Sequence, residues 1–334
     1  MQSAKILVRA TNWVGDAVMS LPALQAIRGA FPQARISMLA KPWVADLYAR
    51  ESFADEVISY ERSWRLLREL RSRKFDMAIL LQNAFEAAAV AFLAGIPRRI
   101  GYDRDGRGFL LTDAIAVPQR GEIPRHERFY YLELLRRAGI VGEIPVCESI
   151  RLNGACAAAD AGRLRFLEMG IEGPVIGVSP GAAYGTAKRW LPERFAEAAC
   201  ALDGTVALFG SGDERALCEE VAAMARQSGR AVHNFAGETT LGAFIEMAAA
   251  CRAYLTNDSG GMHIASALGV PTVAVFGATD DEATGPTGPL AFVVREPVEC
   301  SPCLLRECPI DHRCMTRVTA ARVGHELTRI NSHV

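Results

Sequence analysis

Residues 253–277 read AYLTNDSGGMHIASALGVPTVAVFG, and this stretch decides the fold. An apolar run is followed at once by a glycine-containing turn, a helix-like segment and a second apolar run at 272–278. A strand, a tight turn, a helix and a further strand in this order form a βαβ unit, whose strands lie parallel in one sheet. The N-terminal run 5–10 also leads into a glycine-containing turn and a helix-like segment. We therefore expect an α/β fold with helices on both faces of parallel sheets.

Apolar runs of strand length alternate with amphipathic segments along the whole chain. They lie at 5–10, 34–40, 56–60, 76–82 and 98–103, and then at 174–181, 205–212, 231–237, 253–260 and 272–278. Two successive sets of five strands predict two doubly wound domains. We place the first domain at 1–155, a linker at 156–173 and the second domain at 174–334. Ligands of such domains bind beyond the carboxyl ends of the strands, so the loops there should hold the functional residues.

Composition excludes several classes of protein. The chain has 334 residues and a formal net charge of −1, and no apolar run approaches the roughly 20 residues of a membrane span. Residues 1–150 contain 21 Lys and Arg against 17 Asp and Glu, and the remainder contains 16 against 21. We therefore expect an anionic partner for the first half, and no nucleic-acid partner.

Nine cysteines without an export signal predict a cytoplasmic protein with reduced thiols.

The turn NDSGGMH follows a predicted strand and begins a helix. Backbone N–H groups of Ser259, Gly260 and Gly261 at a helix N-terminus can bind a phosphate or a diphosphate. Asp258 is placed to orient a sugar hydroxyl, and we expect His263 to face the same turn. The alternative is that Asp258 or Ser259 only caps the helix, which is a common role for these residue types.

Two other loops carry charged residues after predicted strands. Lys188 follows the strand at 174–181 and would place a positive charge beside a bound diphosphate, unless it is simply an exposed basic residue. Asp16 stands at the start of the first helix, where the helix dipole favours an ionised carboxylate. Asp16 is therefore either a helix N-cap or a general base that accepts a proton from an attacking hydroxyl group. No GxGxxG motif follows the first strand of either half, which argues against an NAD-dependent dehydrogenase.

Basic residues gather in the first half of the chain. The segment 61–75, ERSWRLLRELRSRKF, predicts a basic amphipathic helix. We favour a solvated face over a sheet for this helix, and an anionic membrane surface is the alternative. A second basic group could bind the phosphate or carboxylate groups of an acceptor, and its members are Arg104, Arg107, Arg125 and His126.

The C-terminal stretch CSPCLLRECPIDHRC contains four cysteines, Cys300, Cys303, Cys308 and Cys314. A Cys-x2-Cys pair followed by two more cysteines can hold zinc. The second pair lacks the Cys-x2-Cys spacing, so we predict a reduced, packed loop without metal and keep zinc as the alternative. A disulfide is disfavoured in a reducing compartment.

Four stretches together resemble the bacterial lipopolysaccharide heptosyltransferases of glycosyltransferase family 9. They are NWVGDAVMSLPALQAIR, PGAAYGTAKRW, TNDSGGMHIASALGVPTVAVFG and CSPCLLRECPIDHRCM. The resemblance covers nearly the whole chain in the expected order. The tryptophan in NWVGD, the AKRW sequence and the cysteine-bearing tail are most similar to the heptosyltransferase II group.

The resemblance implies a fold and an activity. The fold is the GT-B arrangement of two facing Rossmann-like domains with a cleft between them, the first binding the acceptor and the second the ADP-sugar. The activity is inverting transfer of L-glycero-D-manno-heptose from ADP-heptose to the heptosyl-Kdo2-lipid A inner core in lipopolysaccharide biosynthesis. The enzyme would need no obligatory cofactor and would work in the cytoplasm, with a peripheral position on the cytoplasmic face of the inner membrane as the finer expectation.

The resemblance also implies roles for individual residues. Asp16 matches the family's general base, and Lys188 matches the lysine that contacts the donor phosphates. Where first-type heptosyltransferases carry hydroxyl residues before that lysine, this chain has Ala183 and Tyr184, which favours the second type. The implied donor-binding residues are Asp258, Ser259, Gly260, Gly261 and His263, together with Thr239 and Thr240 of the GETTLG segment.

Two alternatives to this function stay open from the sequence. One is a GT-B glycosyltransferase that uses another nucleotide sugar, because the choice of base depends on a few pocket contacts. The other is a non-catalytic protein that binds a nucleotide sugar on the same fold. Loss of the general base would mark such a protein, and the aspartate at position 16 is present.

Overall fold

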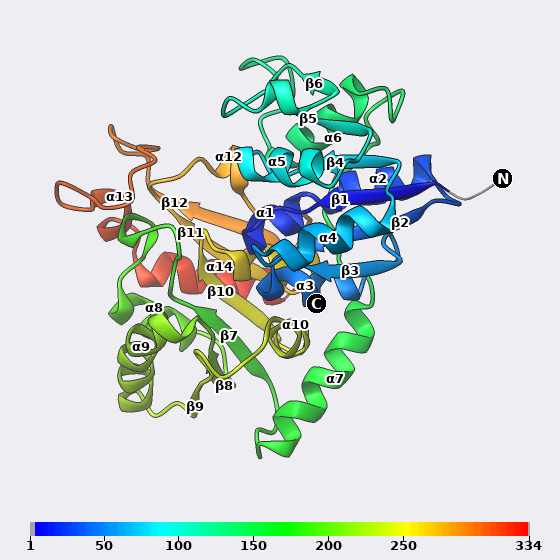
Figure 1. Ribbon diagram of the computed structural model, residues 1–334. Helices are drawn as coiled ribbons and strands as arrows, with labels where there is room; N and C mark the ends of the chain where they lie inside the picture. Colours follow the sequence, from blue (N-terminus) through cyan, green and yellow to red (C-terminus); the bar gives the residue numbers. More distant parts are fainter. Residues whose placement is uncertain (1–3, 333–334) are drawn as a thin grey trace. The chain divides into compact units, whose positions relative to one another are not determined.

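The computed structural model describes residues 4–332 and divides into two compact units, with the division between Cys147 and Glu148 (Figure 1). Each unit contains a six-stranded sheet, and every strand pair in both sheets is parallel. The predicted class, α/β with two Rossmann-like doubly wound domains, is confirmed.

The first unit has the strand order β3-β2-β1-β4-β5-β6. Its strands are β1 (Lys5–Arg9), β2 (Arg35–Ala40), β3 (Glu56–Ser59), β4 (Met77–Leu80), β5 (Arg98–Tyr102) and β6 (Asp113–Ile115). Its helices are α1 (Val14–Met19), α2 (Leu21–Ala30), α3 (Pro42–Ala49), α4 (Trp64–Arg73), α5 (Phe85–Leu93) and α6 (Glu127–Arg137).

Two of these helices cover one face of the first sheet. Leu66 and Leu70 of α4 and Ala88 and Ala91 of α5 enter the same buried cluster as the strand residue Leu80. Helices α2 and α6 contact each other elsewhere in the unit. Right-handed crossovers explain this division, because chain segments that move in opposite directions along a sheet place their helices on opposite faces.

The second unit repeats this order as β12-β11-β10-β7-β8-β9. Its strands are β7 (Val175–Ser179), β8 (Thr205–Leu208), β9 (Val232–Asn234), β10 (Ala253–Asn257), β11 (Thr272–Phe276) and β12 (Ala291–Arg295). Its helices are α7 (Ala155–Glu168), α8 (Pro192–Ala199), α9 (Arg215–Gln227), α10 (Leu241–Ala249), α11 (Gly260–Ala267), α12 (Asp281–Thr284), α13 (Arg313–Thr316) and α14 (Ala320–Asn331). Side chains of α8, α9 and α14 share one core cluster with the strands.

The structure corrects the sequence analysis at two strands and at the linker. Each sheet has a sixth strand that was not predicted, β6 and β12. The segment 156–173, predicted to be a linker, is largely helix α7, which packs against α10 within the second unit. The two helices approach closely because Gly162 has no side chain, and a Cβ there would lie 2.0 Å from the Glu246 carbonyl oxygen.

We expect Gly162→Ala to destabilise the second unit, because the added methyl group must push α7 away from the α10 backbone. Such overpacking costs about 1–3 kcal/mol of unfolding free energy. Gly29→Ala in α2 is the matched control, since a Cβ at that position meets nothing within 4 Å. It should leave stability unchanged or raise it by up to about 1 kcal/mol. Urea denaturation measures both variants, and equal stabilities would contradict the close packing of α7 on α10.

Candidate active site

The strand order selects the regions in which a ligand can bind. The order reverses between β1 and β4 in the first unit and between β7 and β10 in the second. Ligands of open parallel sheets bind outside the carboxyl ends of the strands at such reversals. Asp16 follows β1, Lys188 follows β7 and Asp258 follows β10. Three predicted site residues therefore lie at the positions that the topology favours.

Asp16 is not a helix N-cap. The N-cap of α1 is Trp13, whose side chain makes no capping hydrogen bond, and Asp16 is the third residue of the helix. A carboxylate in the first turn is stabilised by the backbone N–H groups and the helix dipole. The N-cap interpretation was therefore wrong, and the alternative of a functional carboxylate remains.

The segment that leads to Asp16 is held in place by buried side chains. The Arg9 guanidinium is 3% exposed and donates to the Asn12 side-chain oxygen at 2.8 Å, with its Cζ atom 4.2 Å from the Tyr60 ring centre. The Trp43 indole N–H donates to the Asn12 carbonyl oxygen at 2.9 Å. Burial lowers the pKa of Arg9. These contacts fix the backbone that positions α1.

A second carboxyl group lies close to Asp16, and the sequence analysis missed it. Glu127 is the first residue of α6 and is half-buried. Burial raises the pKa of Glu127, the negative charge of Asp16 raises it further, and Arg104 lowers it. The pKa of Tyr131 is raised by burial and by Asp16 as well. The site in the first unit is thus a pair of interacting carboxyl groups bordered by a tyrosine and an arginine.

Arg107 does not belong to the predicted acceptor group. Its side chain is fully buried, and the guanidinium donates to the carbonyl oxygens of Tyr102 and Gln82 and to the Asn83 side-chain oxygen. These bonds fix the loop after β4, and the buried guanidinium is not presented to an acceptor at the surface. Because basic residues are normally exposed, the sequence alone did not reveal this structural role.

The other predicted acceptor residues lie near the carboxyl pair. Arg104 is exposed and forms an ion pair with Asp105 at 3.8 Å. His126 is the N-cap of α6, and its Nδ1 atom accepts from the Arg128 backbone N–H at 3.2 Å. Arg125 precedes it on the exposed loop. Acceptor binding by Arg104, Arg125 and His126 stays a prediction.

Lys188 and Asp258 form an ion pair in the second unit. Lys188 ends a 3-10 turn (Thr186–Lys188), and its Nζ atom lies 2.6 Å from the Asp258 carboxylate. Asp258 is 5% exposed and also accepts a hydrogen bond of 2.7 Å from the Thr279 hydroxyl group, which lies after β11. Lys188 is therefore not a solvated surface residue, and Thr279 joins the site as a residue that the sequence analysis missed.

The turn after β10 has the predicted form. Ser259 is the N-cap of α11, and its hydroxyl oxygen accepts from the Met262 backbone N–H at 3.4 Å. The capping alternative is therefore correct for Ser259, while Asp258 pairs with Lys188 instead. Gly260 begins the helix, and a Cβ on Gly261 would lie 3.2 Å from the Ser179 hydroxyl oxygen. The Lys188 ammonium group and the N-terminus of α11 thus both lie where the strand order of the second sheet reverses. This arrangement suits a phosphate group.

Three other predicted donor residues have different surroundings. His263 is 4% exposed, so its ring is buried rather than presented on the open side of the turn. Thr240 is the N-cap of α10, and its hydroxyl oxygen accepts from the Ala243 backbone N–H at 3.2 Å. Thr239 is half-buried beside it. Contact of these residues with a nucleotide stays a prediction.

The loop that carries Lys188 is fixed from two directions. Asn257 is fully buried, and its amide donates to the Pro180 carbonyl oxygen at 2.7 Å and accepts from the Trp190 backbone N–H at 3.0 Å. The C-terminal tail also touches the loop, since the Arg306 carbonyl oxygen accepts from the Ala187 backbone N–H at 2.9 Å. Both contacts hold the lysine loop at the end of β7.

The four cysteines of the tail are not arranged to hold a metal ion within residues 4–332. All four are free thiols, and only Cys314 is buried. Burial, together with the three neighbouring thiols, raises the pKa of Cys314 to about 11. Across residues 4–332, no three His, Cys, Asp or Glu side chains are arranged to hold a metal ion. The zinc alternative at Cys300, Cys303, Cys308 and Cys314 is therefore not supported by the geometry.

Comparison with known proteins identifies the family. The family model described as "Glycosyltransferase family 9 (heptosyltransferase)" matches residues 63–313. The chain belongs to glycosyltransferase family 9. Lipopolysaccharide heptosyltransferase 2 of Escherichia coli is 34% identical to this glycosyltransferase over 309 residues, which cover 87% of the chain and 88% of the relative. Lipooligosaccharide heptosyltransferase 2 of Haemophilus ducreyi is 31% identical over the same shares of the two chains.

A solved structure supports the fold of this family 9 glycosyltransferase. The structure of E. coli ADP-heptose lipopolysaccharide heptosyltransferase II superposes with a TM-score of 0.84 and 31% identity, covering 98% of this chain and 99% of that one. The resemblance proposed from four sequence stretches is confirmed for the family and for its similarity to the heptosyltransferase II group.

We expect Lys188 and Asp258 to be energetically coupled. Lys188→Met leaves a buried carboxylate without its cation, and Asp258→Asn leaves the ammonium without its anion. A double-mutant cycle by urea denaturation should give a coupling energy of about 1–3 kcal/mol. The exposed pair Arg163 and Asp160 in α7 is the matched control and should give less than about 0.5 kcal/mol. Equal coupling energies for the two pairs would contradict a special role for the buried pair.

We also expect Glu127 to make stability depend on pH. Its pKa is raised in the folded protein, so ionising it costs folding free energy. This cost is absent below the ordinary pKa of Glu, grows as the pH rises, and is complete above the raised value. Glu127→Gln should therefore raise the Tm at pH 7.5 relative to the wild type and leave it nearly unchanged at pH 4. Thermal melts at both pH values measure this, and the same Tm difference at both would refute the raised pKa.

Proposed function

We propose that this glycosyltransferase transfers L-glycero-D-manno-heptose from ADP-heptose to the heptosyl-Kdo2-lipid A inner core of lipopolysaccharide, with inversion at the anomeric carbon. The observation that carries the proposal is the similarity to heptosyltransferase 2, 34% identity over 87% of the chain. The relatives named above are called lipopolysaccharide heptosyltransferase 2 and lipooligosaccharide heptosyltransferase 2, names that support heptose transfer to this class of acceptor.

The donor would bind to the second unit. The diphosphate of ADP-heptose carries negative charge, and the Lys188 ammonium group and the N-terminus of α11 both favour an anion. Asp258 would share Lys188 with the diphosphate and accept a hydrogen bond from a heptose hydroxyl group. As the bond between the anomeric carbon and the diphosphate oxygen breaks, the charge that develops on ADP would be stabilised by these groups.

The acceptor would bind to the first unit, beside Asp16. The attacking hydroxyl oxygen forms the new bond to the anomeric carbon, and its proton passes to the Asp16 carboxylate. Burial and the neighbouring Asp16 charge raise the pKa of Glu127, the second carboxyl group of this site. Arg104 and Arg125 are exposed nearby and suit the phosphate and carboxylate groups of the inner core.

The site of action would be the cytoplasmic surface of the inner membrane, because the acceptor is linked to a lipid. The free thiols of the described residues suit a reducing compartment. In the part of the chain from residue 4 to residue 332, each helix is too short or too polar to cross a bilayer.

Asp16→Asn tests the general base directly. Transfer of heptose to an acceptor that already bears one heptose should fall by about 10²–10⁴-fold, because the amide cannot accept the proton. The Kd for ADP-heptose should stay within about two-fold of the wild type, since the donor contacts lie in the second unit. Every assay contains a chelator, so that transfer by the wild type also tests independence from metal.

Glu143→Gln is the matched control, since it exchanges an exposed carboxylate for an amide in the same unit. It should retain wild-type transfer. An active Asp16→Asn variant would show that Asp16 is not the base. A wild type that binds ADP-heptose but transfers no heptose would show that the proposed acceptor is wrong.

A further inference from the structure

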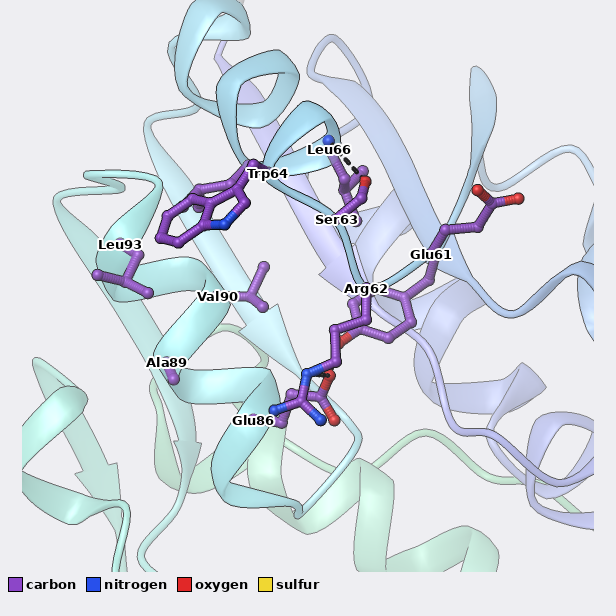
Figure 2. Close-up of a pocket in the computed structure, with 11 residues that line it drawn as sticks. Glu61, Arg62, Ser63, Trp64, Leu66, Glu86, Ala89, Val90 and Leu93 are labelled. Atoms are coloured by element: carbon purple, nitrogen blue, oxygen red, sulfur yellow. Dashed lines mark hydrogen bonds and ion pairs between the residues drawn. The ribbon is translucent and has the colours of Figure 1, made fainter.

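A hollow of about 370 Å³ lies on the surface of the first unit, between the start of α4 and α5 (Figure 2). Its apolar wall includes Trp64, Leu67, Val90 and Leu93. Figure 2 shows the Trp64 ring at the edge of the hollow, on the same side as Leu93. Leu67 and Val90 pack against the core cluster beneath, whereas Trp64 and Leu93 do not belong to that cluster.

Other large apolar side chains of α5 and of the turn after β5 are exposed in the same unit. Trp64 is 79% exposed, and Phe92 and Leu93 at the end of α5 are each 49% exposed. At the other end of α5, Phe85 is 47% exposed and its ring centre lies 6.1 Å from that of Phe109, which is 76% exposed. Exposed apolar side chains that gather on one face usually mark an interaction site. We call these five residues the apolar patch.

A row of arginines borders the apolar patch. Arg65, Arg68 and Arg71 recur every third residue on α4 and are exposed. Their helical spacing places Arg68 and Arg71 on the same side of α4 as Trp64. Arg73 and Arg62 have carboxylate partners, Glu56 and Glu86 respectively. No ion pair of Arg65, Arg68 or Arg71 is found among residues 4–332, so their charges face outward.

We propose that the apolar patch and this arginine row form a docking surface for an anionic phospholipid bilayer. Tryptophan, phenylalanine and leucine side chains enter the interfacial region of a bilayer, while guanidinium groups contact lipid phosphates and their stems lie along the apolar boundary. A solvated basic helix would explain the arginines but not the exposed Trp64 and Leu93. Charge complementarity therefore selects an anionic lipid surface as the occupant.

This inference rests on the proposed function in one respect, since a lipid-linked acceptor brings the enzyme to a membrane. The docking surface adds the residues that make the contact. It also predicts that vesicle binding and sugar transfer are separable properties. The substitutions that remove binding to lipid lie outside the candidate catalytic and donor-binding residues.

Co-sedimentation with large unilamellar vesicles tests the docking surface. The full chain is mixed with vesicles of phosphatidylcholine alone or with 30% phosphatidylglycerol. The wild type should bind the anionic vesicles at least about 10-fold more tightly than the neutral ones, and high salt should weaken the binding. Equal binding to both vesicles, or no binding to either, would overturn the proposal.

Two variants test the apolar and the charged residues of the docking surface separately. Trp64→Ala with Leu93→Ala removes apolar contacts, and Arg65→Gln, Arg68→Gln and Arg71→Gln together remove the charges. Each variant should lose at least about 10-fold in affinity for anionic vesicles, with melting curves as the check on folding. The matched control replaces two exposed leucines of α7, Leu164 and Leu167, by alanine and should bind like the wild type.

Transfer assays separate this inference from the proposed function. Both variants should keep wild-type transfer to a soluble, deacylated acceptor and lose about 10-fold in transfer to the same acceptor embedded in anionic vesicles. A wild type that binds anionic vesicles without any transfer would refute the proposed function and support the docking surface. Variants that still bind vesicles, or that instead lose a dimer seen by size-exclusion chromatography, would overturn the docking surface.

Discussion

Backbone hydrogen bonds join β1 to β4 and β7 to β10, and the position of every functional loop depends on these two ladders. Each ladder lies where the strand order reverses, so the loops on its two sides diverge and leave room beyond the strand ends. In the second unit this geometry brings together Lys188 after β7 and Asp258 after β10. In the first unit it places Asp16 after β1 and the Asn83 loop after β4. Both sheets have the same parallel strand order, so the functional residues of both sites are placed in the same way.

Most of the fold could be predicted because buried parallel strands appear as continuous apolar runs. The two strands that were missed are edge strands, and their patterns are weak for physical reasons. β6 has only three residues, none of them fully buried, and β12 follows a segment rich in glycine and proline. Helix α7 was mistaken for a linker because turn-forming residues flank it, Asn153 and Gly154 before it and the EGP sequence at 172–174 after it. Its small residues are required by the close approach to α10, which no local pattern reveals.

The site could be predicted in part. Residues that act through their own chemistry at strand ends, such as Lys188 and Asp258, stood out in the sequence. Residues whose importance depends on distant partners did not: Thr279 contacts Asp258 across 21 positions, and Glu127 lies near Asp16 only after folding. Arg107, in contrast, was assigned to the site from the sequence although its role is structural. Its charge suggested a surface ligand, but its buried guanidinium instead donates to the backbone carbonyl groups of Tyr102 and Gln82 and to the Asn83 side chain.

The tail supports the lysine loop mainly through its backbone. The carbonyl oxygens of Arg306 and Leu304 accept from the Ala187 N–H and the Tyr184 hydroxyl group, and the Leu304 N–H donates to the Ala278 carbonyl oxygen. Contacts of this kind depend on the path of the chain rather than on the identity of its side chains. Substitutions at 304–306 that keep the path of the chain would therefore leave these three bonds in place, whereas a single insertion or deletion there would shift the register of the carbonyl groups against the loop.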